Sequence, residues 1–172
     1  LYLRDYERAG GERMSEIVIK PDQMAVAEGE TVLITMALGS SLAVCMYDEE
    51  GGIGGLVHTL LPDKRREGNG KNGLRYVDTA TRALFEAMKE AGAVPERIRV
   101  KLVGGAKIFC FAGQAGQPEI GRENVSCARK TLQELDLAIV SEDTGENYGR
   151  SVHFIAGSGR LEIETVNRSR YW

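Results

Sequence analysis

The sequence predicts a single-domain α+β fold built on mixed β-sheets. Its 172 residues fall within the usual size of one domain and suffice to bury a core. Many short segments are rich in β-branched residues or alternate between apolar and polar residues, which predicts strands, whereas only two long segments show helical spacing. Because those helices do not alternate regularly with the strands, a doubly wound parallel fold is not expected.

The domain is predicted to span residues 15–172, with residues 1–14 as an N-terminal tail or extension. The first 13 residues mix charged side chains with Gly10 and Gly11 and keep no sustained period. Beyond them, runs of β-branched and apolar residues begin, and these are typical of strands.

Five strands are predicted in the first part of the domain. Pro21 ends the first of them and Pro62 the last, because proline cannot donate to a sheet ladder. Between the third and fourth strands, residues 38–41 (LGSS) predict a tight connection, and residues 68–73 (GNGKNG) predict a polar loop after the fifth. The five strands are expected at residues 16–19, 24–27, 31–36, 42–47 and 53–61.

Two helices and four further strands are predicted in the rest of the chain. Apolar residues recur at helical spacing over residues 77–91, and Gly92 follows as a stop signal. A second helix is expected from residue 121 or 122 to residue 135. The strands are expected at residues 97–103, 138–142, 151–155 and 160–166, the last two joined as a hairpin across residues 157–159.

Composition and charge argue against several classes of partner. The net charge of -3 is small and the basic residues are scattered, so neither DNA nor RNA is an expected partner. The longest apolar run, residues 32–47, is interrupted and short for a membrane span, so no membrane insertion is expected. The charged N-terminal residues do not resemble a secretory signal, and a cytoplasmic location is therefore expected.

Neither a metal ion nor a cofactor is expected. Cys45, Cys110 and Cys127 lack the spacing of zinc ligands or of a disulfide framework, so they predict reduced, buried thiols. His58 and His153 show no ligand spacing with carboxylates. His153 falls in the predicted hairpin, where a structural or exposed side chain is the expectation.

Two glycine-containing segments have more than one interpretation. Gly104-Gly105 lacks the surrounding pattern of a phosphate-binding loop and therefore predicts a tight turn. The run at residues 142–145 (EDTG) invites an acid/base or metal-binding interpretation, but its carboxylates lack spaced partners. A turn or a wall of a substrate cleft is predicted there instead.

The strongest functional signal lies in residues 35–45 (TMALGSSLAVC) and 54–62 (GGLVHTLLP). These segments resemble the active-site region of the CheD family of chemoreceptor glutamine deamidases, in which a threonine, an LGSC sequence and a histidine before an LP pair occur at the same intervals. The likeness covers about residues 15 to 167, because further family motifs are matched by YVDTA (76–80), VGGAKIF (103–109), IGRENV (120–125) and SEDTGEN (141–147).

The resemblance implies a β-sandwich core flanked by helices and the hydrolysis of selected glutamine side chains on chemoreceptors to glutamate. Some family members also act on methyl esters. It implies two kinds of partner, the methyl-accepting chemoreceptors and a CheC-type phosphatase that competes for the receptor-binding surface. Carried over position by position, the catalytic residues are Ser41, His58 and Thr35, and Ser41 stands where the family has its nucleophilic cysteine.

The chemistry explains why such residues occur together. An amide is a poor electrophile, so a nucleophile must attack its carbonyl carbon while a base takes up a proton and later returns it to the leaving ammonia. His58 would shuttle that proton, and Thr35 would hold the imidazole in one orientation and tautomer. Backbone N–H groups near residues 39–41 would stabilise the oxyanion.

Serine at position 41 leaves several interpretations open. It is either a substitution introduced into a cysteine enzyme or a natural variant that keeps binding and has lost catalysis, which would make the chain a silent module that binds receptors or a CheC-type phosphatase. A third alternative is an unrelated serine amidase that uses Ser41 and His58. Cys45 lies four residues beyond Ser41 along a strand, too far to replace it, and is expected as a core thiol. Apart from the motif, His58 and Thr35 would be ordinary strand residues.

Overall fold

The computed structural model describes residues 14–63, 72–107, 119–165 and 168–171. The predicted tail, most of the polar loop at residues 68–73 and Cys110 lie outside these ranges. The described strands are β1 (Glu16–Val18), β2 (Gln23–Glu28), β3 (Val32–Leu38), β4 (Leu42–Asp48), β5 (Ile53–Thr59), β6 (Arg99–Gly104), β7 (Ala138–Thr144), β8 (Arg150–Ile155), β9 (Leu161–Thr165) and β10 (Arg168–Tyr171). The α-helices are α1 (Val77–Glu90) and α2 (Ile120–Glu134), and short 3-10 helices occur at η2 (Gly73–Arg75) and η3 (Pro95–Arg97).

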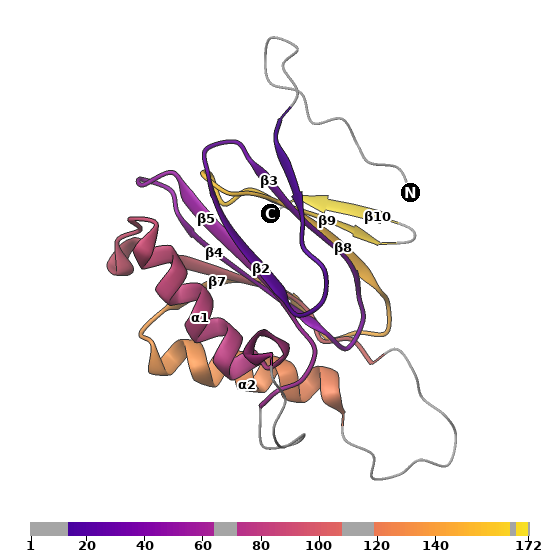
Figure 1. Cartoon of the computed structure of the whole chain (residues 1–172). Helices are drawn as coiled ribbons and strands as arrows, with labels where there is room; N and C mark the ends of the chain where they lie inside the picture. Colours follow the sequence, from indigo (N-terminus) through magenta and orange to yellow (C-terminus); the bar gives the residue numbers. More distant parts are fainter. Residues whose placement is uncertain (1–13, 64–71, 108–118, 166–167, 172) are drawn as a thin grey trace, which may run out of the picture.

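The described strands form two sheets that pack face to face, and the two α-helices cover the outer face of one of them (Figure 1). The helix-covered sheet has the order β2-β5-β4-β6-β7, and the other sheet has the order β1-β3-β8-β9-β10. Each sheet is mixed, because β1 runs parallel to β3 and β6 runs parallel to β7 while the other pairs are antiparallel. The predicted α+β class and the β-sandwich with flanking helices are thus confirmed.

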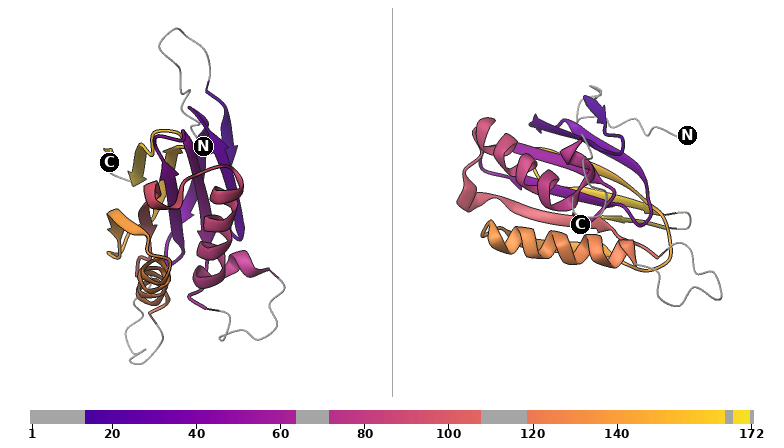
Figure 2. Two further views of the ribbon diagram at one scale, coloured as in Figure 1. Left: turned by 90° about the vertical axis from the view of Figure 1, so that its left-hand side faces the viewer. Right: turned by 60° about the horizontal axis from the view of Figure 1, so that its bottom comes forward.

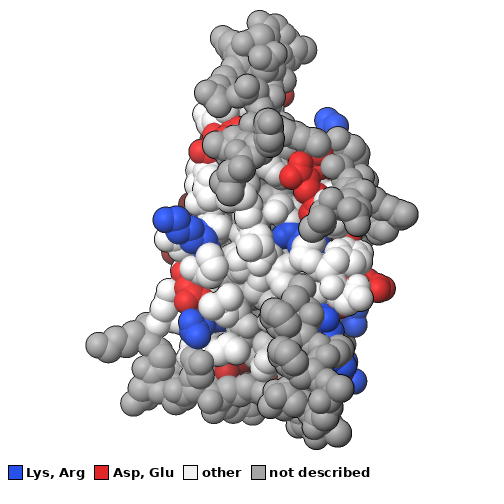
Figure 3. Space-filling view, turned by 90° about the vertical axis from the view of Figure 1, so that its right-hand side faces the viewer, with Lys and Arg blue, Asp and Glu red and all other residues white. Residues whose placement is uncertain are grey.

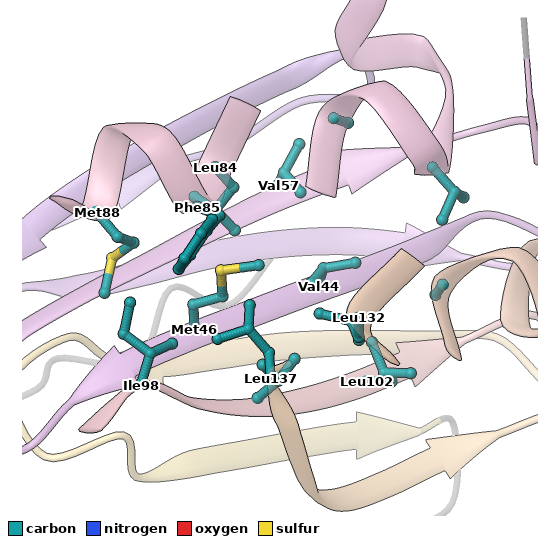
Figure 4. Packing of buried hydrophobic residues seen from close by; sticks show 14 of the residues in the cluster. Val44, Met46, Val57, Leu84, Phe85, Met88, Ile98, Leu102, Leu132 and Leu137 are labelled. Carbon is teal, nitrogen blue, oxygen red and sulfur yellow. The ribbon is translucent and has the colours of Figure 1, made fainter. Parts of the chain in front are cut away.

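The core consists of two apolar layers, one on each face of the helix-covered sheet. Between this sheet and the helices, Leu84 and Met88 of α1 pack with Met46 and Val57 of the sheet (Figure 4). Alternate residues of the same strands, such as Cys45 and Leu56, face the other sheet and pack with Phe154. This division follows from the two-residue period of a strand, which sends neighbouring side chains to opposite faces.

Helices α1 and α2 lie side by side on the same face of the sandwich (Figure 2). Each buries one stripe of side chains: α1 buries Ala80, Leu84 and Met88, among others, and α2 buries Val125 and Leu132. The observed bounds of both helices agree with the predicted ones to within two residues.

The structure corrects the sequence predictions of strands in three places. The predicted strand at residues 53–61 ends earlier, at Thr59. Residues 97–103 become a strand only from Arg99, because Pro95 starts a short 3-10 helix. Strand β10 had no sequence signal. The tight connection predicted at residues 38–41 joins β3 to β4, which lie in different sheets.

Candidate active site

The side chains of Thr35, Ser41 and His58 meet at one end of the sandwich. Ser41 immediately precedes β4, and His58 lies near the end of β5. The two strands are antiparallel neighbours, and His58 of β5 is opposite Ala43 of β4. Thr35 lies on β3 in the other sheet, and its side chain shares the inner face with its pairing partner Val152. The site is therefore assembled between the two sheets.

A chain of hydrogen bonds joins these three residues to the backbone of a fourth. Ser41 Oγ lies 3.0 Å from His58 Nε2, and Thr35 Oγ1 lies 2.8 Å from His58 Nδ1. Thr35 Oγ1 also donates to the carbonyl oxygen of Ile19, 2.8 Å away. Thr35 is fully buried, while His58 is 1% and Ser41 7% exposed, so water competes little for these bonds.

The contact with Ile19 determines which nitrogen of His58 carries the proton. A threonine hydroxyl has one proton, and here it is donated to the Ile19 carbonyl. Thr35 must then accept from His58, so Nδ1 carries the hydrogen and Nε2 presents a lone pair to the hydroxyl of Ser41. This is the tautomer that a general base acting on residue 41 requires.

Burial keeps the imidazole neutral. It lowers the pKa of His58 from 6.5 to about 4, because the charged form would lose its hydration, while the negative charge of Asp22 acts in the opposite direction. The amide of Asp22 donates to the His58 carbonyl over 3.0 Å, which places the two residues side by side. At neutral pH the ring can therefore accept a proton.

The turn that carries Ser41 is held in place by hydrogen bonds that its carbonyl groups accept from the segment after β6. Ala106 donates to the Gly39 carbonyl and Gly105 to the Ser41 carbonyl, each over 2.8 Å. Within the described part of the chain, the amides of Ser40 and Ser41 donate to no backbone carbonyl. Oxyanion stabilisation by amides of residues 39–41 stays a prediction, and the lack of a backbone acceptor for these two amides is compatible with it.

Glycine is required beside this turn. Gly104 has φ of +118°, and a Cβ atom there would lie 2.3 Å from the Ser41 carbonyl oxygen. Gly105 has φ of +64°. Together they let the end of β6 approach the turn that carries Ser41 closely. The tight turn predicted at these two positions is wrong, because Gly104 is the last residue of β6 and no turn is formed at Gly105.

The segment between β7 and β8 lies beside the glycine pair at the end of β6. Residues 142–144 belong to β7, so a turn is wrong there, and the alternative, a wall of a substrate cleft, stays a prediction. Buried Arg150 donates to Asp143 Oδ1 through Nε at 3.0 Å and Nη2 at 2.7 Å, and through Nη1 to the Gly145 carbonyl at 3.0 Å. The Gly145 amide in turn donates to the Gly104 carbonyl, so this segment is tied to the glycine pair.

Sequence reasoning assigned no role to Asn124, which contacts the site from α2. Its Nδ2 donates to the Ser40 carbonyl at 2.8 Å and to the Leu60 carbonyl at 3.0 Å, and the residue is fully buried. The sequence could have indicated this residue, because Asn124 is a polar side chain that shares the helical spacing of buried Gly121, Val125 and Ala128.

The other candidate residues lie away from the site. Cys45 is a fully buried core thiol as predicted, and burial raises its pKa to about 12. Cys127 is only half-buried, which corrects the prediction for that residue. His153 is opposite Ile34 and so faces away from Thr35, with its Nε2 3.9 Å from Glu164.

The described residues were compared with the requirements of a metal site, a membrane-spanning helix and a charged binding surface. Among them, no group of three or more His, Cys, Asp or Glu side chains is arranged to hold a metal ion. None of the described helices is long and apolar enough to cross a membrane. On the face drawn in Figure 3, the basic and acidic side chains of the described surface are interspersed, and neither sign forms a continuous stripe.

Comparison with known proteins finds one matching family and several similar chains. Residues 60–165 match the family described as CheD chemotactic sensory transduction. A Clostridium novyi protein named "Probable chemoreceptor glutamine deamidase CheD" is 38% identical over 151 residues, which cover 88% of this chain and 93% of that protein. A Pyrococcus horikoshii protein of the same name is 32% identical over 157 residues, covering 91% and 96% of the two chains.

A solved structure shares the fold. The crystal structure of Neisseria meningitidis protein NMB0706 superposes with a TM-score of 0.53 and 11% sequence identity, over 84% of this chain and 76% of that one. At this identity the likeness concerns the architecture alone.

Proposed function

This chain belongs to the CheD family, and from that premise we propose that it hydrolyses selected glutamine side chains of chemoreceptors to glutamate. It is thus a hydrolase that acts on protein glutamine amides. The observation that carries the proposal is the hydrogen-bonded series from Thr35 through His58 to the side chain at position 41. Methyl-accepting chemoreceptors are the substrates, and the cytoplasm is where their modified segments would be met.

The geometry supports a two-step reaction. The side chain at 41 gives its proton to Nε2 of His58 and attacks the carboxamide carbon, and the carbonyl oxygen becomes an oxyanion facing the amides of residues 40 and 41. His58 returns the proton to the nitrogen, which leaves as ammonia. Water then attacks the acyl intermediate with His58 as base, which gives glutamate and regenerates the side chain at 41. Thr35 keeps the imidazole in the required tautomer throughout.

Serine at position 41 impairs this reaction. A hydroxyl is a much weaker acid than a thiol, and burial has lowered the pKa of the base that must deprotonate it to about 4. By analogy with the loss of a protease nucleophile, the rate falls by as much as about 10⁶. The hydroxyl still occupies the position of the nucleophile, which is how a cysteine enzyme with a Cys→Ser substitution would look.

The same serine favours a second candidate function. A family member without its thiol would bind receptors, or a CheC-type phosphatase, without modifying them. The buried, hydrogen-bonded arrangement is compatible with this role, because the three polar side chains satisfy one another and keep the site folded. A cysteine codon at position 41 in the native gene would remove the need for this alternative.

The test is to incubate the Ser41→Cys protein with cytoplasmic chemoreceptor fragments and to analyse the receptor peptides by mass spectrometry. We expect glutamine to be converted to glutamate at particular positions by Ser41→Cys and not by the Ser41→Cys/His58→Gln protein. The parent chain with Ser41 serves as a second control. A folded Ser41→Cys protein that leaves its cognate receptor unchanged would exclude the deamidase function.

A further inference from the structure

We infer that Asn124 is a positioning residue for the oxyanion: it holds the Ser40–Ser41 peptide plane so that the Ser41 amide faces the reacting carbonyl. The inference rests on the proposed deamidase function and deepens it. Asn124 lies on α2, in the third layer of the molecule, and touches neither His58 nor the side chain at 41 through any described hydrogen bond.

The side-chain amide of Asn124 donates two hydrogen bonds to backbone carbonyl oxygens near the site. A primary amide has two N–H donors. Nδ2 lies 2.8 Å from the carbonyl oxygen of Ser40 and 3.0 Å from that of Leu60. Because the two acceptors belong to the turn before β4 and to the residue after β5, together they define the orientation of the Asn124 side chain.

Helix α2 is seated tightly enough to act as a fixed support. A Cβ atom added to Gly121 would lie 2.4 Å from the carbonyl oxygen of Gly105, so the first turn of the helix touches the segment that follows β6. Asn124 follows Gly121 by three residues and lies on the same buried face of the helix. The distance from α2 to the turn is therefore set by backbone contact rather than by flexible side chains.

The geometry of a trans peptide converts this support into an orientation of the Ser41 amide. In a trans peptide the C=O of one residue and the N–H of the next point in opposite directions, and the described residues contain no cis peptide bond. With the Ser40 carbonyl held by α2, the N–H of Ser41 must point away from α2. No other described group donates to the Ser40 carbonyl, so its orientation depends on Asn124.

His58 does not depend on the same contact. Its backbone pairs with Ala43 of β4 on one side and with Gln23 of β2 on the other, and Thr35 holds its ring. Loss of Asn124 should therefore disturb the oxyanion donor while leaving the base in place. Two reactions separate these effects: amide hydrolysis forms an oxyanion, whereas alkylation of a thiol by iodoacetamide forms none.

The experiment uses the Ser41→Cys protein as the parent and compares it with Ser41→Cys/Asn124→Leu, which keeps a similar side-chain volume without donors. We expect kcat for receptor deamidation to fall roughly 10²-fold, in line with the loss of one oxyanion donor, with KM little changed. Alkylation of the thiol introduced at position 41, followed by peptide mass spectrometry, should keep its rate to within about threefold.

The matched control is Leu132→Ala, which removes a fully buried side chain from the same helix without touching the turn. It should lower the thermal midpoint and leave kcat unchanged at temperatures where the protein is folded. If Asn124→Leu does not fold, Asn124→Asp keeps the shape, replaces two N–H donors by at most one O–H and is judged by the same criteria.

Three outcomes would overturn the inference. Full deamidation by a folded Asn124 variant would show that the Ser40 carbonyl needs no such support. Deamidation and alkylation falling together would show that the contact serves His58 or general stability instead. An inactive parent would defeat the proposed function, and this inference with it, whereas an active parent with active Asn124 variants defeats the inference alone.

Discussion

Thr35 and His58 lie on strands of different sheets, yet Oγ1 of Thr35 is 2.8 Å from Nδ1 of His58. This bond makes the protonation pattern of the site a consequence of sheet packing. The hydroxyl is turned toward Ile19, accepts from the ring and leaves Nε2 free to act on the side chain at 41. The catalytic arrangement therefore depends on how the sandwich closes.

The first prediction concerns the tautomer of His58. In the chain as it stands, nitrogen-detected NMR should show Nδ1 protonated and Nε2 unprotonated at neutral pH, because Thr35 can only accept. In the Ser41→Cys protein, Thr35→Val should lower kcat by roughly 10²-fold or more, since a triad base in the wrong tautomer is inactive. Thr35→Ser, which keeps the hydroxyl, is the control. A proton on Nε2, or a fully active Thr35→Val protein, would contradict the assignment.

The second prediction concerns the dependence of stability on pH. The pKa of His58 is lowered from 6.5 to about 4 in the folded state, so between these values the unfolded chain binds a proton that the folded chain does not. The stabilisation is fully present above about pH 6.5 and is lost as the pH falls toward 4, by on the order of 3 kcal/mol.

Urea unfolding of the parent and of His58→Gln across this range measures the effect. The difference between their unfolding free energies should decrease with falling pH between about 6.5 and 4. The pKa of Asp48 is lowered to about 2, mainly by its hydrogen bonds with Arg97, so its contribution disappears at lower pH and is common to both proteins. A difference that stays constant across this range would refute the depressed pKa of His58.

The third prediction concerns the reactivity of the thiols. Cys45 is fully buried and its pKa is raised to about 12, so at pH 8 native Cys45 should react with iodoacetamide at least about 10³-fold more slowly than in denaturant. The thiol of Ser41→Cys lies beside an imidazole and should react fastest. Peptide mass spectrometry assigns each site. Rapid labelling of Cys45 in the folded protein would contradict this prediction and would make Cys45 a candidate for the nucleophile in place of residue 41.

The fourth prediction concerns the buried ion pair between the two sheets. Arg150 on β8 and Asp143 on β7 are both buried, with Nη2 2.7 Å from Oδ1. Asp143→Leu should destabilise the protein by about 3–5 kcal/mol because it leaves a buried guanidinium without its carboxylate. The double variant Asp143→Leu/Arg150→Met should be more stable than Asp143→Leu alone. Denaturant unfolding of the parent, the two single variants Asp143→Leu and Arg150→Met, and the double variant gives the coupling energy, and additive effects would show that the pair is not a unit.

Much of the fold follows from local patterns. The helix at α1 was predictable because one apolar stripe recurs at helical spacing and Gly92 ends it, and the β8–β9 hairpin because alternation resumes across residues 157–159. Strand β10 was missed because its residues carry no apolar alternation. Residues 38–41 predict a tight connection, but nothing in their sequence states whether the next strand joins the same sheet.

For the candidate site, only the resemblance to the CheD family pointed to Thr35, Ser41 and His58, because apart from those motifs Thr35 and His58 would be ordinary strand residues. The hydrogen bond from Thr35 to the Ile19 carbonyl could not be predicted, because every residue has a backbone carbonyl and the residue type does not reveal its partner. Asn124 was quoted within a motif, but its two acceptors lie more than 60 residues away along the chain.

The amino-acid sequence by itself thus determined which segments form strands and helices, because these depend on local side-chain properties, and its family motifs indicated Thr35, Ser41 and His58 as the candidate site residues. Only the tertiary structure decided which strands share a sheet, which nitrogen of His58 bears the proton and which backbone carbonyls Asn124 holds. Those three features depend on contacts between segments distant in the chain, and hydrogen bonds of that kind arise only when the layers pack together.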